Sequence, residues 1–379
     1  MLYIGKRQFI KMNIKKYLTS ILEYVFVLMI IMDCNTIYAN LIVNPINYQN
    51  NALLVGIALV FSLVVFDESI NLKKLIILAY KPAIYVFVYM LALMFIIKIQ
   101  NGFLGSYIKD FLLFLPFCIV LFKIYNYRDQ SYRLFHCYTN IILFLAIVSL
   151  VLWILVGVFK VITPNEIIEC SWGKKLEIKS FHGIYFERTY EQFENLFGKT
   201  VVRNIGIFPE SPMYDIGLIT ALFSEIFLKK KPSWIKSMVI IVTIITTFGT
   251  LAIMLSIFGL FLAFCSKQKF GKKVVLMSAI IVILLMLILI TYKKTFGHGS
   301  YSTHVDDIFV CIKAWKMNPL IGAGFQNYNT IYMNLSEWRK GNSGITTSLG
   351  CVMAQGGIVM TVAVIYPYLK LIYIGLKNN

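Results

Sequence analysis

Residues 141–159 read IILFLAIVSLVLWILVGVF, nineteen positions without a charged side chain. An α-helix needs about 20 consecutive, mainly apolar residues to cross the hydrocarbon core of a lipid bilayer. A run of this length and composition is typical of a transmembrane helix. We therefore predict a membrane-spanning helix over residues 140–161.

The rest of the chain has the same character. Of its 379 residues, 59% are apolar and only 14% are charged, whereas roughly a quarter of the residues in a soluble domain are charged. The mean hydropathy of +0.75 excludes an ordinary soluble globular protein. We expect an all-α polytopic membrane protein with about ten transmembrane helices, forming one integral membrane domain over residues 1–379. The nine further predicted spans are 18–38, 52–66, 75–97, 111–125, 213–228, 235–248, 251–265, 274–292 and 345–374.

Four of the predicted spans are unusual. Segment 18–38 follows five basic residues, as in a signal peptide, but it exceeds the ~7 to 15 residues of a signal-peptide core, so we interpret it as an uncleaved first span. Residues 246–250, TTFGT, join two short segments so tightly that a broken helix pair also fits. Segment 345–374 is long, and its beginning also fits an extramembrane turn.

Basic residues are distributed very unevenly between the short loops. Twenty lie on one side of the predicted membrane, and only Lys98 and Lys109 lie in the short loops of the other side. Because Lys and Arg collect in cytoplasmic loops, we place both termini in the cytoplasm. Topology then explains most of the formal net charge of +18, and no nucleic-acid partner is needed. The twenty are Lys6, Arg7, Lys11, Lys15, Lys16, Lys73, Lys74, Lys123, Arg128, Arg133, Lys229, Lys230, Lys231, Lys236, Lys267, Lys269, Lys272, Lys273, Lys370 and Lys377.

Two loops on the predicted outer face, 160–211 and 293–344, are unusually long. Loops longer than ~12 to 15 residues usually carry function. Each contains an amphipathic helical pattern, which predicts a helix that either lies along the membrane surface or packs against the ends of the spans. The first pattern is Tyr190, Phe193, Leu196 and Phe197, with Thr189 and Gln192 as a capping pair and Gly198 as C-cap; the second is Val305, Ile308, Phe309, Ile312 and Trp315, with Thr303 and Asp306 at its start.

Residues 203–215, RNIGIFPESPMYD, are the most informative part of the first loop. Arg203, Glu210 and Asp215 fall where water meets lipid, beside Gly and Pro residues that leave backbone N–H groups free to bind an anion. We infer a cradle for a diphosphate group. The alternative is that Arg203 extends to the lipid headgroups and Glu210 caps the next helix.

The second loop contains residues 304–307, HVDD, and residues 315–325, WKMNPLIGAGF. Taken alone, the NPLIGAG stretch predicts a helix stop followed by a glycine turn. Gly322 and Gly324 form a G-x-G, but no strand precedes them and no third Gly follows, which excludes a dinucleotide-binding motif. The seven cysteines form no C-x-x-C pair and no His lies at zinc-ligand spacing, so we expect neither a metal nor a cofactor.

The two motifs, in this order and each in a long outer loop, resemble the Wzy-type polysaccharide repeat-unit polymerases and the O-antigen polymerase-ligase superfamily. Members show R-x-x-G-x-F followed by acidic residues and Pro, which corresponds here to residues 203–212. A surface helix ending in P-L-x-G-x-G follows, here at residues 319–324, and then a terminal span with paired glycines, here Gly356 and Gly357.

This resemblance implies a metal-independent glycosyltransferase in a bacterial plasma (inner) membrane, with its active site on the outer face. The implied substrate is an oligosaccharide on undecaprenyl diphosphate, used for a capsule or an O-antigen-like polysaccharide. The implied partners are membrane lipids, a chain-length regulator and a flippase. The chain departs from the family at His304, where many members have Arg, at Thr346, where ligases have His, and near Gly249 and Thr250, where a Ser-Arg pair often stands.

Sugar transfer from a lipid diphosphate needs cations for the departing diphosphate and a base for the attacking hydroxyl. His304 suits a base because an unperturbed imidazole titrates near pH ~6.5, and Arg203 is the best-placed cation. We expect Lys313 and Arg339 to be weaker cation candidates, and Asp307 to be a further acidic one. The predicted catalytic residues are Arg203, Glu210, His304 and Asp306, and the predicted substrate-binding residues are Arg188, Asp215, Lys316, Gly322 and Gly324.

Five of the ionisable residues inside predicted spans stand out, because charges there are costly and usually functional. Asp33 and Asp215 lie toward the outer ends, and we expect them to position sugar hydroxyls or to pair with Arg203. We expect Lys81 and Glu225 to extend to the cytoplasmic headgroups. Glu23 is the fifth.

We interpret the chain as a repeat-unit polymerase. The Thr at position 346 counts against a ligase. A transporter or flippase is the alternative from another class, but transporters usually show internal repeats and midplane charge pairs, and the sequence shows no repeat.

Overall fold

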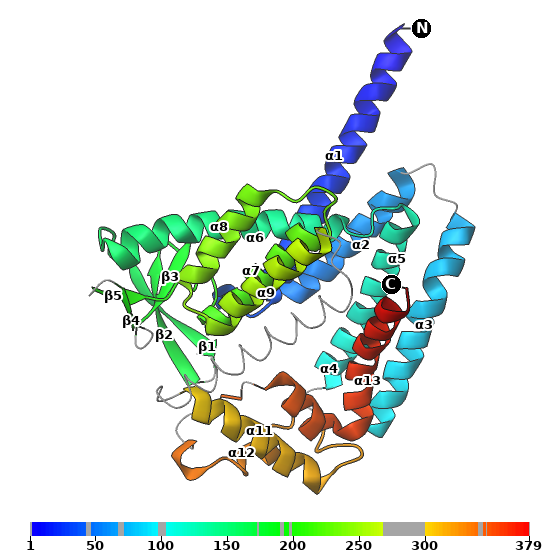
Figure 1. The fold of residues 1–379 in the computed structure, drawn as a ribbon. Coiled ribbons are helices and arrows are strands. Elements are labelled where there is room, and N and C mark those ends of the chain that lie inside the picture. The colour runs from blue at the N-terminus through cyan, green and yellow to red at the C-terminus, as the bar shows by residue number, and fades with distance from the viewer. Residues whose placement is uncertain are drawn as a thin grey trace. The chain divides into compact units, whose positions relative to one another are not determined.

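A computed structural model describes residues 2–42, 47–66, 72–97, 104–172, 174–189, 193–196, 199–267, 300–339, 344–345 and 347–378. The chain forms two compact units, drawn together in Figure 1. Unit 1 comprises Met1–Leu72 and Ile124–Leu289, and unit 2 comprises Lys73–Lys123 and Ile290–Asn379.

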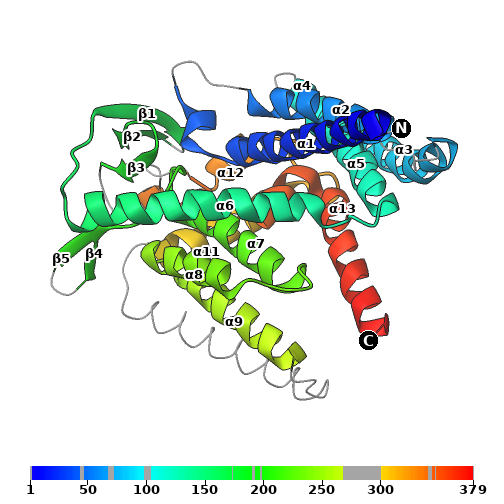
Figure 2. The same cartoon turned by 90° about the horizontal axis from the view of Figure 1, so that it is seen from above.

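Unit 1 is a group of helices with a small sheet at one end. Helix α6 packs beside α1, α7 and α8, and Figures 1 and 2 show the strands gathered where α6 ends. The helices are α1 (Leu2–Asp33), η1 (Ile37–Asn40), α2 (Tyr48–Phe66), α6 (Arg133–Leu152) continued by the π-helix η4 (Trp153–Val158), α7 (Ser211–Phe227), α8 (Trp234–Thr246) and α9 (Thr250–Lys267).

The first long loop of unit 1 forms strands, so the expectation of an all-α protein is wrong here. An antiparallel sheet has the order β1-β2-β3, and β4 and β5 form a separate hairpin. The predicted helix at residues 190–197 is also wrong, because Phe193 and Leu196 lie in β4 and pair with Val202 and Lys199. The strands are β1 (Glu166–Trp172), β2 (Lys174–Phe181), β3 (Tyr185–Arg188), β4 (Phe193–Leu196) and β5 (Lys199–Val202).

The wrong helix has a physical reason. Only residues 197 and 198, Phe-Gly, separate β4 from β5, and two short β-prone runs joined by two residues ending in Gly are also a hairpin pattern. Periodicity over so few positions does not distinguish the two. Tertiary packing decides the outcome, because Val201 joins Phe181, Tyr185 and Trp153 in a buried cluster under the sheet. The Trp153 Nε1 also donates to the carbonyl of Val202 at 2.7 Å.

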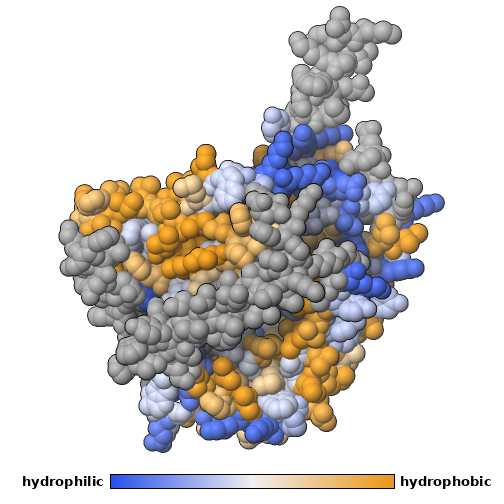
Figure 3. Space-filling model, in the orientation of Figure 1, coloured by the Kyte–Doolittle hydropathy of each residue, from blue (hydrophilic) through white to orange (hydrophobic). Residues whose placement is uncertain are grey.

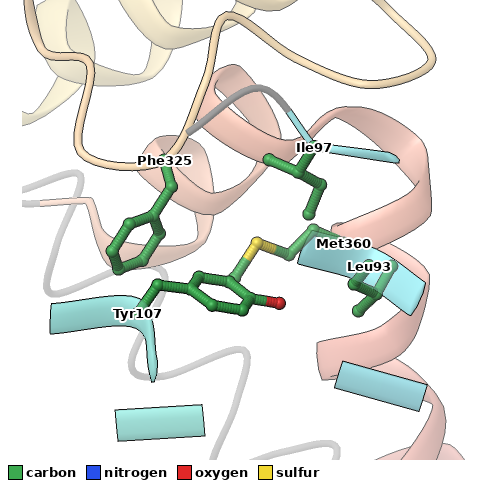
Figure 4. Close-up of a cluster of buried hydrophobic side chains, with 5 residues drawn as sticks. All are labelled: Leu93, Ile97, Tyr107, Phe325 and Met360. Carbon is green, nitrogen blue, oxygen red and sulfur yellow. The ribbon is translucent and has the colours of Figure 1, made fainter. Parts of the chain in front are cut away.

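Unit 2 packs its helices around an aromatic cluster. Figure 4 shows Tyr107, Phe325 and Met360 meeting beside Leu93 and Ile97, and the Tyr107 hydroxyl donates to the carbonyl of Met90 at 2.9 Å. The helices are α3 (Leu72–Ile96), α4 (Leu104–Tyr107), the π-helix η3 (Ile108–Phe114), α5 (Leu115–Tyr127, whose last residues belong to unit 1), α11 (Ser300–Met317), α12 (Asn329–Tyr332), η5 (Glu337–Arg339) and α13 (Ser348–Asn378).

A mostly helical protein with helices able to span a membrane is confirmed; ten spans are not. Within the described residues, four helical segments are long and apolar enough to cross a bilayer: Tyr48–Phe66, Ile76–Ile96, Arg133–Val158 and Ser348–Gly375. Two shorter apolar helices are Trp234–Thr246 and Thr250–Cys265. The predicted spans 18–38 and 213–228 are largely helical, as parts of α1 and α7, and 111–125 is divided between η3 and α5. The predicted span 274–292 lies outside the described residues.

The surface of unit 1 agrees with membrane burial. Figure 3 shows an apolar surface where α6 and α8 lie, and a hydrophilic surface beside α1. Among the exposed apolar side chains, Phe144 and Ile147 belong to α6, and Ile235 and Met238 belong to α8. Large apolar side chains on a helix exterior are expected where lipid rather than water surrounds the protein.

Helix α11 confirms the predicted helix in the second long loop, but a different face is buried. Val310, Cys311 and Ala314 are buried together with Ala354 of α13, whereas Ile308 and Phe309 from the predicted stripe are 50% and 59% exposed. Small side chains allow close helix approach, which favours this face in packing. The larger stripe stays on the surface, so α11 both packs on a neighbouring helix and presents an apolar face.

Candidate functional site

The Arg203 motif forms an ordered loop between β5 and α7. Asn204 is fully buried, and its side-chain amide donates to the Thr246 hydroxyl at 3.0 Å. Its side-chain oxygen accepts from the Gly206 backbone N–H at 3.1 Å, and its own backbone N–H donates to the Thr246 carbonyl. Farther along, the rings of Phe208 and Tyr214 stack 5.4 Å apart. The loop is therefore tied to the end of α8 and to the first turn of α7.

The carboxylate of Asp215, a residue of α7, lies beside the break between α8 and α9. Its side chain is 6% exposed and accepts a 2.6 Å hydrogen bond from the Thr247 hydroxyl. The Arg203 guanidinium interacts with the same carboxylate electrostatically. A Cβ added at Gly249 would lie only 1.9 Å from Asp215 Oδ2, so glycine is needed there. The tight junction at residues 246–250 thus holds a carboxylate close to the motif arginine.

Strand β3 brings a second cation to the motif. Arg188, at the end of β3, lies 3.5 Å from Glu210. Glu210 occupies the N-cap position of α7, as the alternative interpretation of the motif predicts, but its side chain makes no capping hydrogen bond. Its carboxylate instead pairs with Arg188. Four predicted residues, Arg188, Arg203, Glu210 and Asp215, therefore belong to one part of unit 1.

The same strand contributes two residues that the sequence did not single out. Tyr185 and Glu187 are 0% and 6% exposed, and their alternate positions on β3 place them on one face of the strand. Burial raises the pKa of the Glu187 carboxyl to about 7, although Lys179 and Lys160 partly oppose the shift. Burial also raises the pKa of Tyr185, with Glu187 and Tyr214 adding to the effect. A carboxylic acid that titrates near neutrality is suited to proton transfer.

Several buried polar atoms around β3 and the start of α7 have no hydrogen-bond partner among the described residues. Such atoms are rare in proteins, since an unpaired buried polar group costs about 1 to 3 kcal/mol. Gathered beside the Arg203 motif, they offer hydrogen-bonding capacity to a polar molecule. They are Tyr185 OH, Glu187 Oε1, Arg188 Nε, Thr189 Oγ1 and Ser211 Oγ.

Arg339 has a structural role in unit 2. Its side chain is fully buried and bonds Asp307 Oδ1 at 2.8 Å and the carbonyls of Thr303 and Gly344 at 2.9 Å and 2.6 Å. The neighbouring Asp306 accepts a 2.5 Å hydrogen bond from the Ser336 hydroxyl. These contacts tie the start of α11 to η5, so Arg339 and Asp307 are explained by packing.

The glycine motif of unit 2 docks onto a break in α13. The backbone N–H groups of Ala323 and Gly324 donate to the carbonyls of Ala354 and Gln355, at 2.9 Å and 2.8 Å. In return, the Ile358 N–H donates to the Pro319 carbonyl at 2.9 Å. A Cβ on Gly322 or Gly357 would lie 2.3 Å from backbone of the opposite segment, and both residues have a positive φ. Gly322 and Gly324 thus serve close backbone packing, whether or not substrate also binds there.

The structure divides the predicted site residues between the two units. Unit 1 holds the set around Arg203, and unit 2 holds His304, Asp306, Lys316, Gly322 and Gly324. His304 and Lys316 are exposed along α11, and Asp306 is partly buried. Glu23 and Glu225, from the predicted spans, are both buried and ion-paired, with Arg133 and Lys229 respectively. The expectation that Glu225 extends to the headgroups is therefore wrong.

The chemistry available at the unit 1 site comes from guanidinium, carboxyl and phenol groups. In the part of the chain that the structure describes, no group of three or more His, Cys, Asp or Glu residues is placed to hold a metal ion. Searches against family models, curated proteins and solved structures found no match.

Proposed function

We propose that the protein is a polymerase of undecaprenyl-diphosphate-linked oligosaccharide repeat units for a bacterial surface polysaccharide. The observation that carries this proposal is the contact between β3 and the Arg203 motif, where Arg188 meets Glu210. That contact joins Arg188 to the motif that contains Arg203, and the same strand carries Glu187, a buried carboxyl group with a pKa of about 7. Cations for a diphosphate and a base for a hydroxyl are the two needs of this reaction.

The reaction balances with these groups. The hydroxyl oxygen of the acceptor sugar attacks the anomeric carbon of the lipid-linked donor, and the bond from that carbon to the diphosphate oxygen breaks. The diphosphate leaves with the electron pair, and Arg203 and Arg188 stabilise its added charge. Glu187, in its ionised form, accepts the hydroxyl proton. Asp215 holds Arg203 in place and orients sugar hydroxyls.

A ligase and a transporter or flippase are the alternative functions. A ligase would use the same diphosphate contacts but a different acceptor, and Thr346 stands where ligases carry His. A flippase would move the lipid without needing a base. The buried Glu187, on the same strand as Arg188, favours a group-transfer reaction over transport, because a carboxyl group adds nothing to diphosphate binding alone.

Deletion of the gene tests the proposal. We expect single repeat units on undecaprenyl diphosphate to accumulate at the outer leaflet and long polysaccharide to disappear, and we expect the wild-type gene to restore it. Accumulation of the same lipid at the inner leaflet would indicate a flippase. Long lipid-linked chains that are no longer attached to their final acceptor would indicate a ligase.

The role of Arg203 is tested in the same strain. A guanidinium makes bidentate bonds to phosphate oxygens that an ammonium does not reproduce. Each charge-assisted hydrogen bond contributes roughly 1.5 to 3 kcal/mol, so we expect Arg203→Ala and Arg203→Lys each to lower polymerisation about tenfold or more while the protein still accumulates. His182→Ala, at the exposed turn between β2 and β3, is the matched control and should be fully active. A fully active Arg203→Lys variant would remove Arg203 from the diphosphate site.

A further inference from the structure

Unit 1 contains a cavity of about 1170 Å³ at the end of α6 that is remote from the sheet. Three separate segments supply its basic side chains. Lys15 and Lys16 come from α1. Arg128 comes from the turn before α6, and Arg133 is the first residue of α6. Lys229, Lys230 and Lys231 come from the chain after α7. The carboxylates among the lining residues are Glu23 and Asp129. The lining therefore has a strong excess of positive charge.

Part of this charge is neutralised within the protein. Arg133 lies 2.7 Å from Glu23, whose other oxygen accepts a 2.9 Å hydrogen bond from Tyr125. Lys229 lies 2.5 Å from Glu225. The Glu23 contacts join α1 to α6 and to Tyr125 of α5 and use both oxygens of Glu23, whereas the Lys229–Glu225 pair stays within α7 and the residues that follow it. Asp129 is then the remaining carboxylate of the lining, against the lysines of α1 and of the segment after α7.

We propose that this cavity binds a phosphate-bearing anion, supplied by the headgroup of an anionic phospholipid in the cytoplasmic leaflet. Like charges held together in a concave surface repel one another, and a bound anion relieves that repulsion. Clustered Lys and Arg beside a membrane attract anionic lipid. The cavity binds the headgroup, and its apolar wall, with Leu63, Phe66 and Leu228, receives the first part of the acyl chains.

The depth of the cavity in the membrane and its polar side chains both suit a lipid headgroup. Helix α6 with η4 spans 26 residues, or roughly 39 Å at 1.5 Å per residue, and the cavity lies at its Arg133 end. A hydrocarbon core is about 30 Å thick, which places the cavity at headgroup depth on the predicted cytoplasmic face. His136 also lines the cavity, and its Nδ1 is buried without a hydrogen-bond partner among the described residues. Thr19 and Ser62 add hydroxyl groups, 2.6 Å apart.

The binding experiment uses the full-length protein in a neutral detergent. Cardiolipin, phosphatidylglycerol and phosphatidylcholine are added separately, and retained lipid is counted by native mass spectrometry while the thermal midpoint is followed in parallel. We expect the two anionic lipids to be retained and to raise the midpoint, since a ligand that binds only the folded state stabilises it. Phosphatidylcholine, whose phosphate is neutralised by choline, should do neither. The effect should weaken as salt is raised, because the contacts are electrostatic.

A matched pair of variants assigns the lipid to the cavity. Lys16→Gln/Lys230→Gln/Lys231→Gln removes three cavity lysines that are exposed and outside the Glu23 and Glu225 pairs. Lys73→Gln/Lys123→Gln/Lys370→Gln removes three exposed lysines, also on the predicted cytoplasmic face, that do not line the cavity. We expect the first variant to lose anionic-lipid affinity about tenfold or more and the second to keep it.

Three results would overturn the proposal. Equal retention of anionic lipid and phosphatidylcholine would show that phosphate charge is not recognised. Equal losses in the two triple variants would show that general positive charge, not the cavity, attracts the lipid. Inorganic diphosphate tested without lipid separates the two sources: if it raises the midpoint of the wild type but not of the cavity variant, while lipid has no effect, the ligand is a soluble anion.

Discussion

Thr247 donates a 2.6 Å hydrogen bond to the carboxylate of Asp215, across the break that separates α8 from α9. The same hydroxyl oxygen lies 2.7 Å from the Ile244 carbonyl and accepts from the Gly249 N–H at 3.2 Å. Thr247 thus links the last turn of α8, the carboxylate and the start of α9. The position of Asp215, and with it the electrostatic support of Arg203, depends on this one hydroxyl and on the absence of a side chain at Gly249.

Substitution of Gly249 tests that dependence. In Gly249→Ala the new methyl group would overlap Asp215 Oδ2, so the carboxylate must move and lose its hydrogen bond. Hydrogen bonds to charged groups contribute about 1.5 to 3 kcal/mol, and we expect polymerisation to fall roughly tenfold. Gly105→Ala, where a Cβ would meet nothing within 4 Å, is the control and should be fully active. Normal activity of Gly249→Ala would show that polymerisation does not depend on the position of the Asp215 carboxylate.

Glu187 should make folding stability depend on pH. Its folded-state pKa of about 7 exceeds the ordinary value of 4.5, so between these values the folded protein binds more protons than the unfolded chain. Stability should therefore fall as the pH rises from about 4.5 to about 7 and then level off, by at most about 3 kcal/mol. The thermal midpoint in detergent, followed against pH, measures this slope.

Glu187→Gln provides the comparison. It should remove the fall in folding stability between pH about 4.5 and about 7. As the proposed base, Glu187 should also be required for polymerisation, so the same variant should be inactive. Glu177→Gln, an exposed position on the adjacent strand β2, should retain both the slope and the activity. A slope that survives in Glu187→Gln would assign it to another group.

The Arg339–Asp307 pair should be essential for the stability of unit 2. Both side chains are fully buried, and removal of one partner leaves an uncompensated buried charge, at a cost of about 3 to 5 kcal/mol. We expect Arg339→Met to lower the thermal midpoint strongly, and Arg339→Met/Asp307→Asn to recover part of the loss. His304→Ala, at an exposed position of α11, the helix that contains Asp307, should leave the thermal midpoint unchanged. A neutral Arg339→Met would contradict the packing role.

Cysteine labelling tests the topology. The native Cys34 is exposed, so it is replaced by Ser in each variant before a new cysteine is introduced. We expect an impermeant maleimide to label His182→Cys and Asn329→Cys in intact cells, and Lys230→Cys only after permeabilisation. Labelling in the reverse order would invert the orientation, and with it the assignment of the cavity to the cytoplasmic leaflet.

The sequence predicted most reliably what depends on local composition. Residues 133–158 form a helix able to span a membrane because, from Ile141 to Val158, Ser149 is the one polar side chain. The stop after α11 is also confirmed, since α11 ends at Met317 and Gly322 adopts a positive φ. Both features follow from the properties of a few consecutive residues and need no knowledge of their neighbours in space.

Long-range packing decided what the sequence did not predict. The hairpin at Phe193–Leu196 depends on β5, and the buried face of α11 depends on Ala354 of α13. Glu187 had no signal, because a single glutamate in a mixed loop gives no pattern. Its altered pKa comes from burial against Gly157 and Trp153. The alternation of Tyr185, Phe186 and Glu187 was the one available hint, since it places Tyr185 and Glu187 on one side of a strand.

The break in α13 has a consequence for biosynthesis. A continuous helix makes its backbone hydrogen bonds within itself, so it needs no other segment to pair its polar groups in the bilayer. In α13 the carbonyls of Ala354 and Gln355 are satisfied instead by the N–H groups of Ala323 and Gly324, which leave the ribosome about thirty residues earlier. Until that loop meets the break, these carbonyls have no backbone partner within α13. The helix is therefore completed only by contact with an earlier part of the chain.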